Sequence, residues 1–419
     1  MANFHQPGSL IPGETHHCPS DLSTEIPGHR PTDAQSRPVP TSLSWIEISA
    51  SALTANARTF RSLIGQEVKL YAVVKANAYG HGVEIIAPAA IAAGADGLAV
   101  YSAGEGLHLR ALGITAPVLT LGYVPRSQLE AAVAADLDIT VFTKEALEAA
   151  AAAAQAVGRQ VRIHLKVETG THRQGMYLAE FIECLNVFAA NRWLHLQGVS
   201  THFANIEDTT EHSFAHSQQL KFDQYLACAA ARDMPVPVPH TACTAAAMLF
   251  PSTYFKAVRV GIGIYGLWPS KETYLSSLQL SDGNIRLQPV LTWRTIVSQV
   301  KVVPAGAYIG YGCTFRATRE TTIALLPIGY ADGYARQLSN AAHVLIHGKR
   351  APVRGRICMN VTMADVSDHG PVTPEDEVIL LGRQGDETVS AEYLAGLCGT
   401  INYEFVTRIS PAVPRRLVP

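Results

Sequence analysis

Paired cysteines are missing from this chain of 419 residues. None of its seven cysteines is spaced as Cys-x-x-Cys, and their number is odd. That distribution argues against a disulfide framework and against a zinc cluster, so we expect no metal and a reducing compartment, by default the cytoplasm. The cysteines are Cys18, Cys184, Cys228, Cys243, Cys313, Cys358 and Cys398.

Long apolar runs and an excess of charge are missing too. No uninterrupted apolar stretch reaches the roughly 20 residues that a membrane span needs, and the polar first 44 residues do not look like a secretory signal peptide. The formal net charge is −2, from 33 Lys and Arg against 35 Asp and Glu. We therefore expect no partner, nucleic acid or membrane, that is held by bulk charge.

What the chain has is apolar material for a large core. Hydrophobic residues make up 47% and charged residues 16%, and the length suits two or three domains. Residues 1–44 are rich in Pro, His and Ser without apolar periodicity, which predicts a disordered leader. We expect domains at 45–284 and 285–419, with the first strand, 45–49, able to pack with the second domain.

Short apolar runs alternate with helical segments between Lys69 and Gly263. Eight β/α alternations predict a parallel (β/α)8 barrel of the TIM type. A doubly wound sheet remains the alternative, because alternation alone does not show that the sheet closes. The runs are KLYAVV, DGLAV, PVLTLG, DITVF, VRIHLKV, LQGVST, VPVPHTA and AVRVGIG.

After about Ser281 the pattern changes to strands separated by Gly and Pro, with few helices. This predicts a second, mostly β domain. A helical stretch, SAEYLAGLCGTINYEFVTRIS, comes near the end, before a basic tail, PRRLVP. The strands are LTWRTIVSQVKVV, TTIALLPIG, HVLIHG, APVRGRI, VTMADV and EVILLG.

Polar side chains end several of the eight barrel strands, where such barrels carry their active residues. Lys75 closes the first strand as the one lysine of AVVKANAYGHG. A buried lysine has a depressed pKa and suits Schiff-base chemistry, whereas a strand-end lysine can also simply reach solvent. The other polar strand ends carry Lys166, Arg173, His202, His240, Thr244 and Arg259.

The segment from Gly261 to Gly266, GIGIYG, matches the dinucleotide pattern GxGxxG. The match is weak, because Trp268-Pro269 follows where that pattern needs a helix. Free glycine N–H groups and the Thr244 hydroxyl could instead bind one phosphate beside the last strands. A Schiff-base lysine, a monophosphate site and an arginine together predict pyridoxal 5'-phosphate (PLP) as cofactor.

These motifs resemble the alanine racemase family, for which AVVKANAYGHG is the most specific signature. The resemblance runs from about Trp45 to Pro419. It implies a PLP-binding barrel followed by a β domain, in a homodimer whose active sites are shared between subunits. It also implies the interconversion of L- and D-alanine, which supplies D-alanine for peptidoglycan.

The resemblance further implies roles for single residues. Lys75 and Tyr311 match two catalytic bases on opposite faces of the substrate, and Tyr311 comes from the partner subunit. Arg173 and Met359 match contacts to the substrate carboxylate, and Lys166 matches a lysine that is often carbamylated. The cofactor-binding positions are Lys75, Tyr79, His202, Thr244, Arg259, Gly261, Ile262 and Tyr403, with Tyr265 a further member of the phosphate shell and His240 a support for Arg259.

Three segments depart from the family pattern near its substrate pocket. Asn360 stands where many members have aspartate, Pro411 where some have tyrosine, and Thr171-His172 where Met-Gly is commoner. A serine or broad-specificity amino-acid racemase on the same scaffold is therefore the alternative function. A PLP decarboxylase, which lacks the YGHG lysine motif, and a PLP carrier built from the barrel alone are more distant alternatives.

Overall fold

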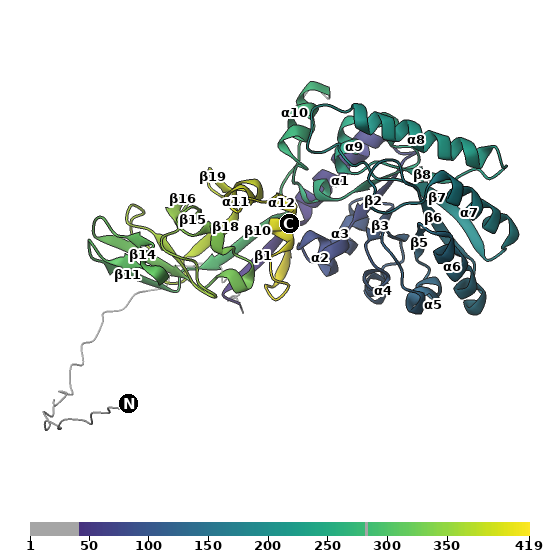
Figure 1. The fold of residues 1–419 in the computed structure, drawn as a ribbon. Coiled ribbons are helices and arrows are strands. Elements are labelled where there is room, and N and C mark those ends of the chain that lie inside the picture. The colour runs from purple at the N-terminus through teal and green to yellow at the C-terminus, as the bar shows by residue number, and fades with distance from the viewer. Residues whose placement is uncertain (1–41, 281–283) are drawn as a thin grey trace, which may run out of the picture. The chain divides into compact units, whose positions relative to one another are not determined.

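The protein is described by a computed structural model that covers residues 42–280 and 284–419 (Figure 1). The predicted leader lies outside the described residues up to residue 41. Strand β1 (Ser44–Ser49) opens the described chain, and helix α1 (Ala50–Ile64) follows at once. The Ser49 hydroxyl caps α1 by accepting the N–H of Ala52 at 3.1 Å, which explains why the helix starts there.

Eight parallel strands form the barrel that the alternating pattern predicts. Strand β2 pairs with both β3 and β9, so the first and last strands of the series are neighbours. Between β8 and β9 the sheet is bridged by hydrogen bonds from Lys256 N to Pro239 O and from Arg259 N to Ala242 O. The barrel is thereby confirmed, and the doubly wound alternative is wrong. The strands are β2 (Lys69–Val73), β3 (Gly97–Val100), β4 (Val118–Thr120), β5 (Asp138–Val141), β6 (Val161–Lys166), β7 (Leu194–Ser200), β8 (Val238–His240) and β9 (Ala257–Val260).

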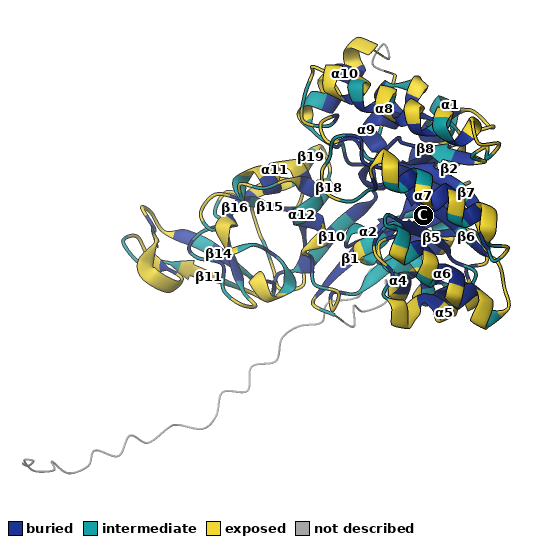
Figure 2. Ribbon diagram, turned by 45° about the vertical axis from the view of Figure 1, so that its right-hand side comes forward, coloured by how far each residue is buried: buried dark blue, intermediate teal, exposed yellow. Residues whose placement is uncertain are grey.

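Helices cover the outside of the barrel, and the strands within are buried (Figure 2). The alanine-rich helix α6 shows why: Thr143 caps its start, Gly158 at φ +72° ends it, and its small side chains pack closely on the strands. No helix of the described residues is long and apolar enough to cross a membrane. The helices after α1 are α2 (Lys75–Tyr79), α3 (Val83–Ala92), α4 (Ala103–Ala111), α5 (Arg126–Ala134), α6 (Lys144–Val157), α7 (Leu178–Ala190), α8 (Ser213–Ala230), α9 (Thr244–Leu249) and α10 (Lys271–Leu280).

The second half is the mostly β domain that the sequence predicts. Its largest sheet runs β16-β15-β18-β10-β1-β20, with β19 beside β18, and a smaller sheet runs β11-β14-β17. Its elements are β10 (Leu291–Ile296), β11 (Gln299–Val303), β12 (Tyr308–Ile309), β13 (Phe315–Arg316), β14 (Thr321–Leu326), β15 (His343–Ile346), β16 (Lys349–Pro352), β17 (Thr362–Asp365), β18 (Glu377–Gln384), β19 (Glu387–Val389), α11 (Ala391–Leu397), α12 (Asn402–Thr407) and β20 (Arg415–Val418).

Two ends of the described chain meet in this sheet. Strand β1 pairs antiparallel with β10 and parallel with β20. Strand β20 lies in the segment PRRLVP, for which the sequence predicts only a basic tail. A strand of four residues with two arginines has no clear apolar alternation, so pairing with β1 decides its structure. Because β1 leads directly into α1, the barrel and the β domain share this connection.

Candidate active site

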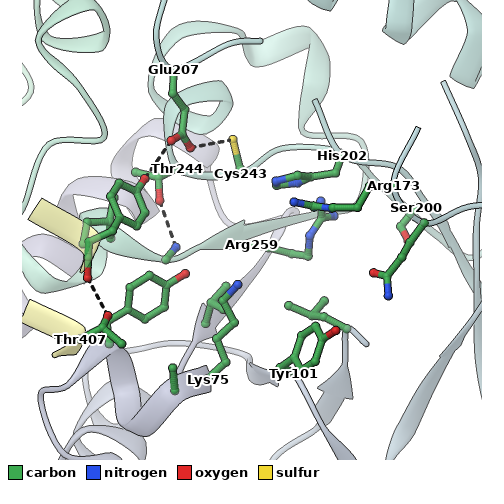
Figure 3. Close-up of a pocket in the computed structure, with 18 of the residues that line it drawn as sticks. Lys75, Tyr101, Arg173, Ser200, His202, Glu207, Cys243, Thr244, Arg259 and Thr407 are labelled. Atoms are coloured by element: carbon green, nitrogen blue, oxygen red, sulfur yellow. Dashed lines mark hydrogen bonds between the residues drawn. The ribbon is translucent and has the colours of Figure 1, made fainter. Parts of the chain in front are cut away.

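A cavity of about 890 Å³ opens at the carboxyl ends of the barrel strands, with residues of α12 on one side (Figure 3). Its position agrees with the expectation that strand ends carry the active residues. Ten of the site residues that the sequence singles out line it: Lys75, Tyr79, Lys166, Arg173, His202, Thr244, Arg259, Gly261, Ile262 and Tyr403.

A left-handed turn presents the first two of these residues. Ala76, Asn77, Ala78 and Tyr79 all have φ between +52° and +54°, so α2 winds against the usual hand after Lys75. Such a conformation costs about 1–2 kcal/mol for each residue with a Cβ. The turn brings both Lys75 and Tyr79 to the cavity, and strain of this kind is typical of functional sites.

The β domain holds this turn in place. Arg415 of β20 donates from Nη2 to the carbonyl oxygen of Gly80 at 2.8 Å, directly after the turn. A Cβ at Gly80 would lie 2.1 Å from the carbonyl oxygen of Val406 in α12, so only glycine allows this close approach. The position of Lys75 therefore depends on contacts with residues more than 300 positions away in the chain.

The lysines of the cavity are poorly solvated and lie among cations. Burial, and then the charge of Arg173, lowers the pKa of Lys75. Burial, and then the charges of Arg259, Arg173 and Lys75, lowers the pKa of Lys166 to about 8. A lysine with a lowered pKa is neutral more often near neutral pH, and the neutral amine is the form that acts as nucleophile or base.

A small polar recess lies between β9 and α9. The Thr244 hydroxyl accepts the N–H of Gly261 at 3.0 Å and that of Gly263 at 3.5 Å. A Cβ at Gly261 would lie 2.5 Å from Tyr79 Oη, so the tyrosine hydroxyl reaches this backbone only because the residue is glycine. Together these groups offer hydroxyls and a bare backbone to one small anion.

Two features of the GIGIYG segment differ from what the sequence suggested: Tyr265 does not line the cavity, and no dinucleotide helix follows the glycines. Tyr265 is fully buried, its hydroxyl donates to the Val73 carbonyl at 2.7 Å, and it does not line the cavity. Its ring packs 5.1 Å from that of Tyr79. The residues Ile262–Tyr265 form a short 3-10 turn within GIGIYG, so the helix of a dinucleotide site does not follow.

Both terminal nitrogens of the Arg259 guanidinium donate hydrogen bonds to protein groups. Nη1 donates to His240 Nδ1 and, at 3.1 Å, to His240 O, while Nη2 donates to Thr201 O at 2.9 Å and Thr241 O at 3.0 Å. Within the described residues Nε makes no hydrogen bond, and Arg259 lines the cavity. Burial lowers the pKa of this guanidinium to about 10, so it keeps its charge at neutral pH.

The structure also brings in Glu207, which the sequence reasoning missed. Its carboxylate accepts the Tyr403 hydroxyl at 3.0 Å and lies 3.7 Å from Cys243 Sγ. Burial raises the pKa of Glu207. The only signal in the sequence is a carboxylate five residues after His202, and the path of the loop that carries it back to the cavity could not be read from that.

Two predicted residues lie away from the cavity. Tyr311 is 72% exposed and Met359 is 56% exposed, and neither lines the cavity of its own chain. Tyr311 follows Gly310, whose φ of +74° makes the turn that presents the phenol outward. The departures Asn360 and Pro411 are exposed as well.

Comparison with known proteins gives one consistent family. Profiles for the alanine racemase N-terminal domain and C-terminal domain match residues 48–269 and 290–417. The alanine racemase of Symbiobacterium thermophilum is 42% identical over 372 residues, which are 89% of this chain and 96% of that protein.

Solved structures agree with this. The alanine racemase of a D-cycloserine-producing Streptomyces lavendulae superposes with a TM-score of 0.84 at 35% identity, covering 91% of this chain and 98% of that one. The histidine racemase of Leuconostoc mesenteroides gives a TM-score of 0.82 at 26% identity, over 91% and 99%. With both halves matched and relatives covered almost end to end, the chain belongs to the alanine racemase family.

Proposed function

We propose that this protein is a PLP-dependent alanine racemase. It interconverts L- and D-alanine in the cytoplasm as a homodimer and supplies D-alanine for peptidoglycan. The observation that carries the proposal is the gathering of ten predicted residues, from both halves of the chain, around one cavity.

The residues present fit PLP. The recess of Thr244, Gly261 and Tyr79 suits its phosphate, and the unused Nε–H of Arg259 suits the ring nitrogen. Lys75, with its lowered pKa, suits the aldehyde. Bound PLP withdraws electrons from the substrate and so weakens its Cα–H bond.

Two bases then move the proton. Lys75 Nζ takes or returns it on the face used by D-alanine, and Tyr311 Oη does the same on the face used by L-alanine. A phenol is a weak base near neutral pH unless cations stabilise its charged form. Arg173 and the other cations of the cavity are suited to do this.

Arg259 controls the outcome at the ring nitrogen. A guanidinium has donors only, so Nε–H can donate to that nitrogen but cannot be the acceptor for a proton on it. Arg259 would thereby keep that nitrogen unprotonated and the withdrawal of electrons modest. Return of the proton to Cα is thereby favoured over side reactions.

Arg173 and the backbone N–H of Met359 bind the substrate carboxylate. Lys166 lines the same cavity, and its pKa of about 8 leaves a neutral amine available for carbamylation. A carbamylated Lys166 would be an anion, which could hold Arg173 by charge-assisted hydrogen bonds.

The positions of Tyr311 and Met359 support the proposed homodimer. Both are large, exposed and outside the cavity of their own chain. An exposed tyrosine can serve as a base only where it meets substrate, and a second copy of the chain supplies that encounter by symmetry. We therefore propose two composite sites for each dimer.

The test is to incubate the purified, PLP-loaded protein with separate L-amino acids and to analyse the products by chiral chromatography. D-alanine should form fastest by a wide margin. The Lys75→Ala variant is the matched control. Borohydride reduction should attach the cofactor covalently to the peptide that contains Lys75 in the wild type and to no peptide of the variant. Absence of any D-amino acid would contradict the proposal.

A serine or broad-specificity racemase is the second candidate. It is favoured by the departures at Asn360, Pro411 and Thr171-His172, and by the match to a histidine racemase, which has the same fold. One altered contact in a small pocket changes discrimination by only about 1–3 kcal/mol. If D-serine or several D-amino acids form as fast as D-alanine, this candidate replaces the first.

A further inference from the structure

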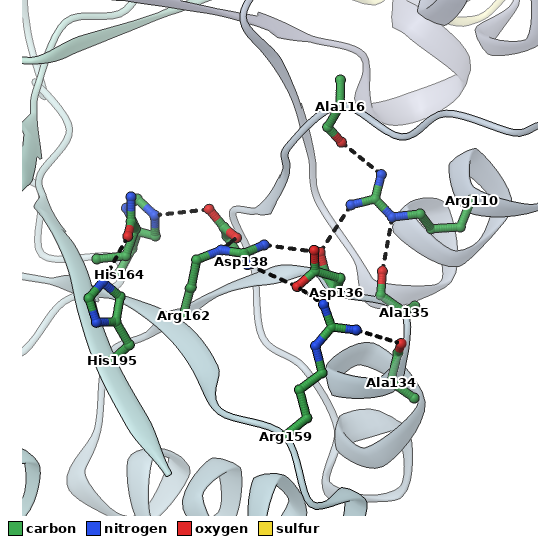
Figure 4. Close-up of polar contacts among 11 residues, drawn as sticks. Arg110, Ala116, Ala134, Ala135, Asp136, Asp138, Arg159, Arg162, His164 and His195 are labelled. Carbon is green, nitrogen blue, oxygen red and sulfur yellow. Dashed lines mark hydrogen bonds and ion pairs between the residues drawn. The ribbon is translucent and has the colours of Figure 1, made fainter. Parts of the chain in front are cut away.

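A line of buried polar side chains runs through the barrel behind Arg259, and Figure 4 shows its far end, where His164, Asp138 and Arg162 meet. Arg259 donates to His240 Nδ1, and His240 Nε2 lies 2.9 Å from His164 Nδ1. His164 Nε2 lies 3.5 Å from Asp138 Oδ2, within reach of an ion pair but without the angles of a hydrogen bond. The four residues come from β9, β8, β6 and β5, and none is more than 7% exposed. We call this line the imidazole wire.

The intervening strand makes room for the wire. At Gly198 in β7 a Cβ would lie 2.3 Å from His164 Nδ1 and 2.8 Å from its Cε1. No side chain fits there without pushing His164 away from His240. The contact between the two imidazoles thus depends on a glycine in the strand that separates them.

The chemistry of the two ends sets the direction of every proton in the wire. Arg259 has donors only, so His240 Nδ1 must accept and the His240 proton must be on Nε2. His240 then donates to His164 Nδ1, which leaves the His164 proton on Nε2, facing Asp138. A carboxylate accepts only, so the order is consistent from end to end.

The charges at the ends agree with this order. Burial opposes the charged form of Asp138, but the neighbouring His164 and Arg162 keep its pKa below the usual value. Burial, and then Arg259, lowers the pKa of His240, so it is neutral. At the far end Arg162 Nε meets Asp138 at 2.5 Å and its Nη1 meets Asp136 at 2.8 Å, nearer the surface.

We propose that Asp138 and His164 are positioning residues for Arg259: they fix His240 as the Nε2–H tautomer and thereby hold the Arg259 Nε–H toward the cavity. With the other tautomer, an N–H of His240 would face an N–H of Arg259, and that anchor of the guanidinium would be lost. The inference rests on the proposed function, because the direction of the Nε–H matters only if it donates to the ring nitrogen of bound PLP.

The first test needs no variant that could misfold. Long-range proton–nitrogen NMR correlation of the full-length, PLP-loaded protein, labelled with [15N]histidine, distinguishes a protonated ring nitrogen from a bare one. His164 and His240 should each show a bare Nδ1 and a protonated Nε2. A protonated Nδ1 on either residue would overturn the proposal. His164→Gln and His240→Gln serve only to assign the signals.

The second test replaces the acceptor at the far end of the wire by a group that can also donate a hydrogen bond. In Asp138→Asn the amide can donate to His164 Nε2, which allows the opposite tautomers along the wire. The histidine signals should shift or double, and the absorbance of bound PLP should change. The kcat should fall by roughly 10–100-fold, which is the scale observed when a residue that orients a metal ligand is removed. The KM for alanine should change little, because Asp138 does not line the cavity.

Asp136→Asn is the matched control. Asp136 contacts Arg162 and Arg159 but no imidazole, so its loss should leave the histidine signals unchanged and kcat within about twofold. If both variants behave alike, Asp138 acts only through the ion pairs and the wire is refuted. If the tautomers are as expected but no D-amino acid forms, the wire stands and the proposed function fails.

Discussion

The close contact between Gly261 and Tyr79 gives the sharpest quantitative prediction. A Cβ at position 261 would lie 2.5 Å from Tyr79 Oη and 3.1 Å from its Cζ. Ordinary contacts need about 3.5 Å or more, so Gly261→Ala requires roughly 1 Å of movement. The Tyr79 ring cannot give way freely, because it packs 5.1 Å from Tyr265 and 6.1 Å from Tyr403.

Overpacking of this size costs about 1–3 kcal/mol. If the cost falls on the loaded state, PLP should bind about 5- to 150-fold more weakly. If it falls equally on the empty protein, the free energy of unfolding should drop instead. Titration of the empty protein with PLP, followed by fluorescence, and denaturant unfolding of the same sample measure both.

A double-mutant cycle with Tyr79→Phe identifies the atom responsible. The phenylalanine removes Oη and leaves Cζ as the nearest atom, so the double variant should recover more than half of the loss. Gly104→Ala in α4 is the control, because its Cβ would meet only Ser102 Oγ, at 3.8 Å. Unchanged affinity and stability in Gly261→Ala, or strict additivity in the cycle, would refute the close packing of this recess.

Three further predictions concern charge and proton transfer. Tyr311→Phe should lower L-to-D turnover by roughly 10²–10⁴-fold with PLP still bound; normal turnover in a chiral assay would remove Tyr311 as the second base. PLP affinity of the wild type should weaken as the pH rises through the raised pKa of Glu207, since the carboxylate then repels phosphate, and titrations of Glu207→Gln should lack that dependence. The pKa of Lys166 is about 8 in the folded protein and 10.5 in the unfolded chain. Between about pH 8 and pH 10.5 the unfolded chain therefore binds more protons than the folded protein. The free energy of unfolding of the empty protein should rise with pH over this range by up to about 3 kcal/mol. Unfolding curves of Lys166→Met should lack this rise, and an identical pH dependence would contradict the burial of this amine.

Much of the barrel could be predicted because its information is local. The eight apolar runs are each bounded by helical segments, and the period of the pattern changes where the β domain begins. Lys75 could be singled out because it is the one lysine of AVVKANAYGHG and closes an apolar strand, and Arg259 because it is the one charged residue in the apolar run AVRVGIG. Closure of the sheet, by contrast, needs β2 to meet β9, and no local pattern states that pairing.

The rest depends on contacts between distant segments. The left-handed turn after Lys75 goes against the preference of alanine and is held by Arg415 and Val406, near the other end of the chain. Glu207 reaches the cavity only through the path of its loop. His164 reads as an ordinary inward residue of a strand, and only the fold shows that it lies between His240 and Asp138.

The cations of the cavity show what such contacts add to the chemistry. Lys75, Lys166, Arg173 and Arg259 are spread along the sequence but line one cavity. Burial, and then Arg173, lowers the pKa of Lys75, and burial, and then the other three cations, lowers the pKa of Lys166. An assembly of like charges is unfavourable in the empty protein and becomes favourable when anions enter. The proposed ligands bring two anions, a phosphate and a carboxylate. The same cations that add to the effect of burial on Lys75 therefore also select the molecules on which it acts.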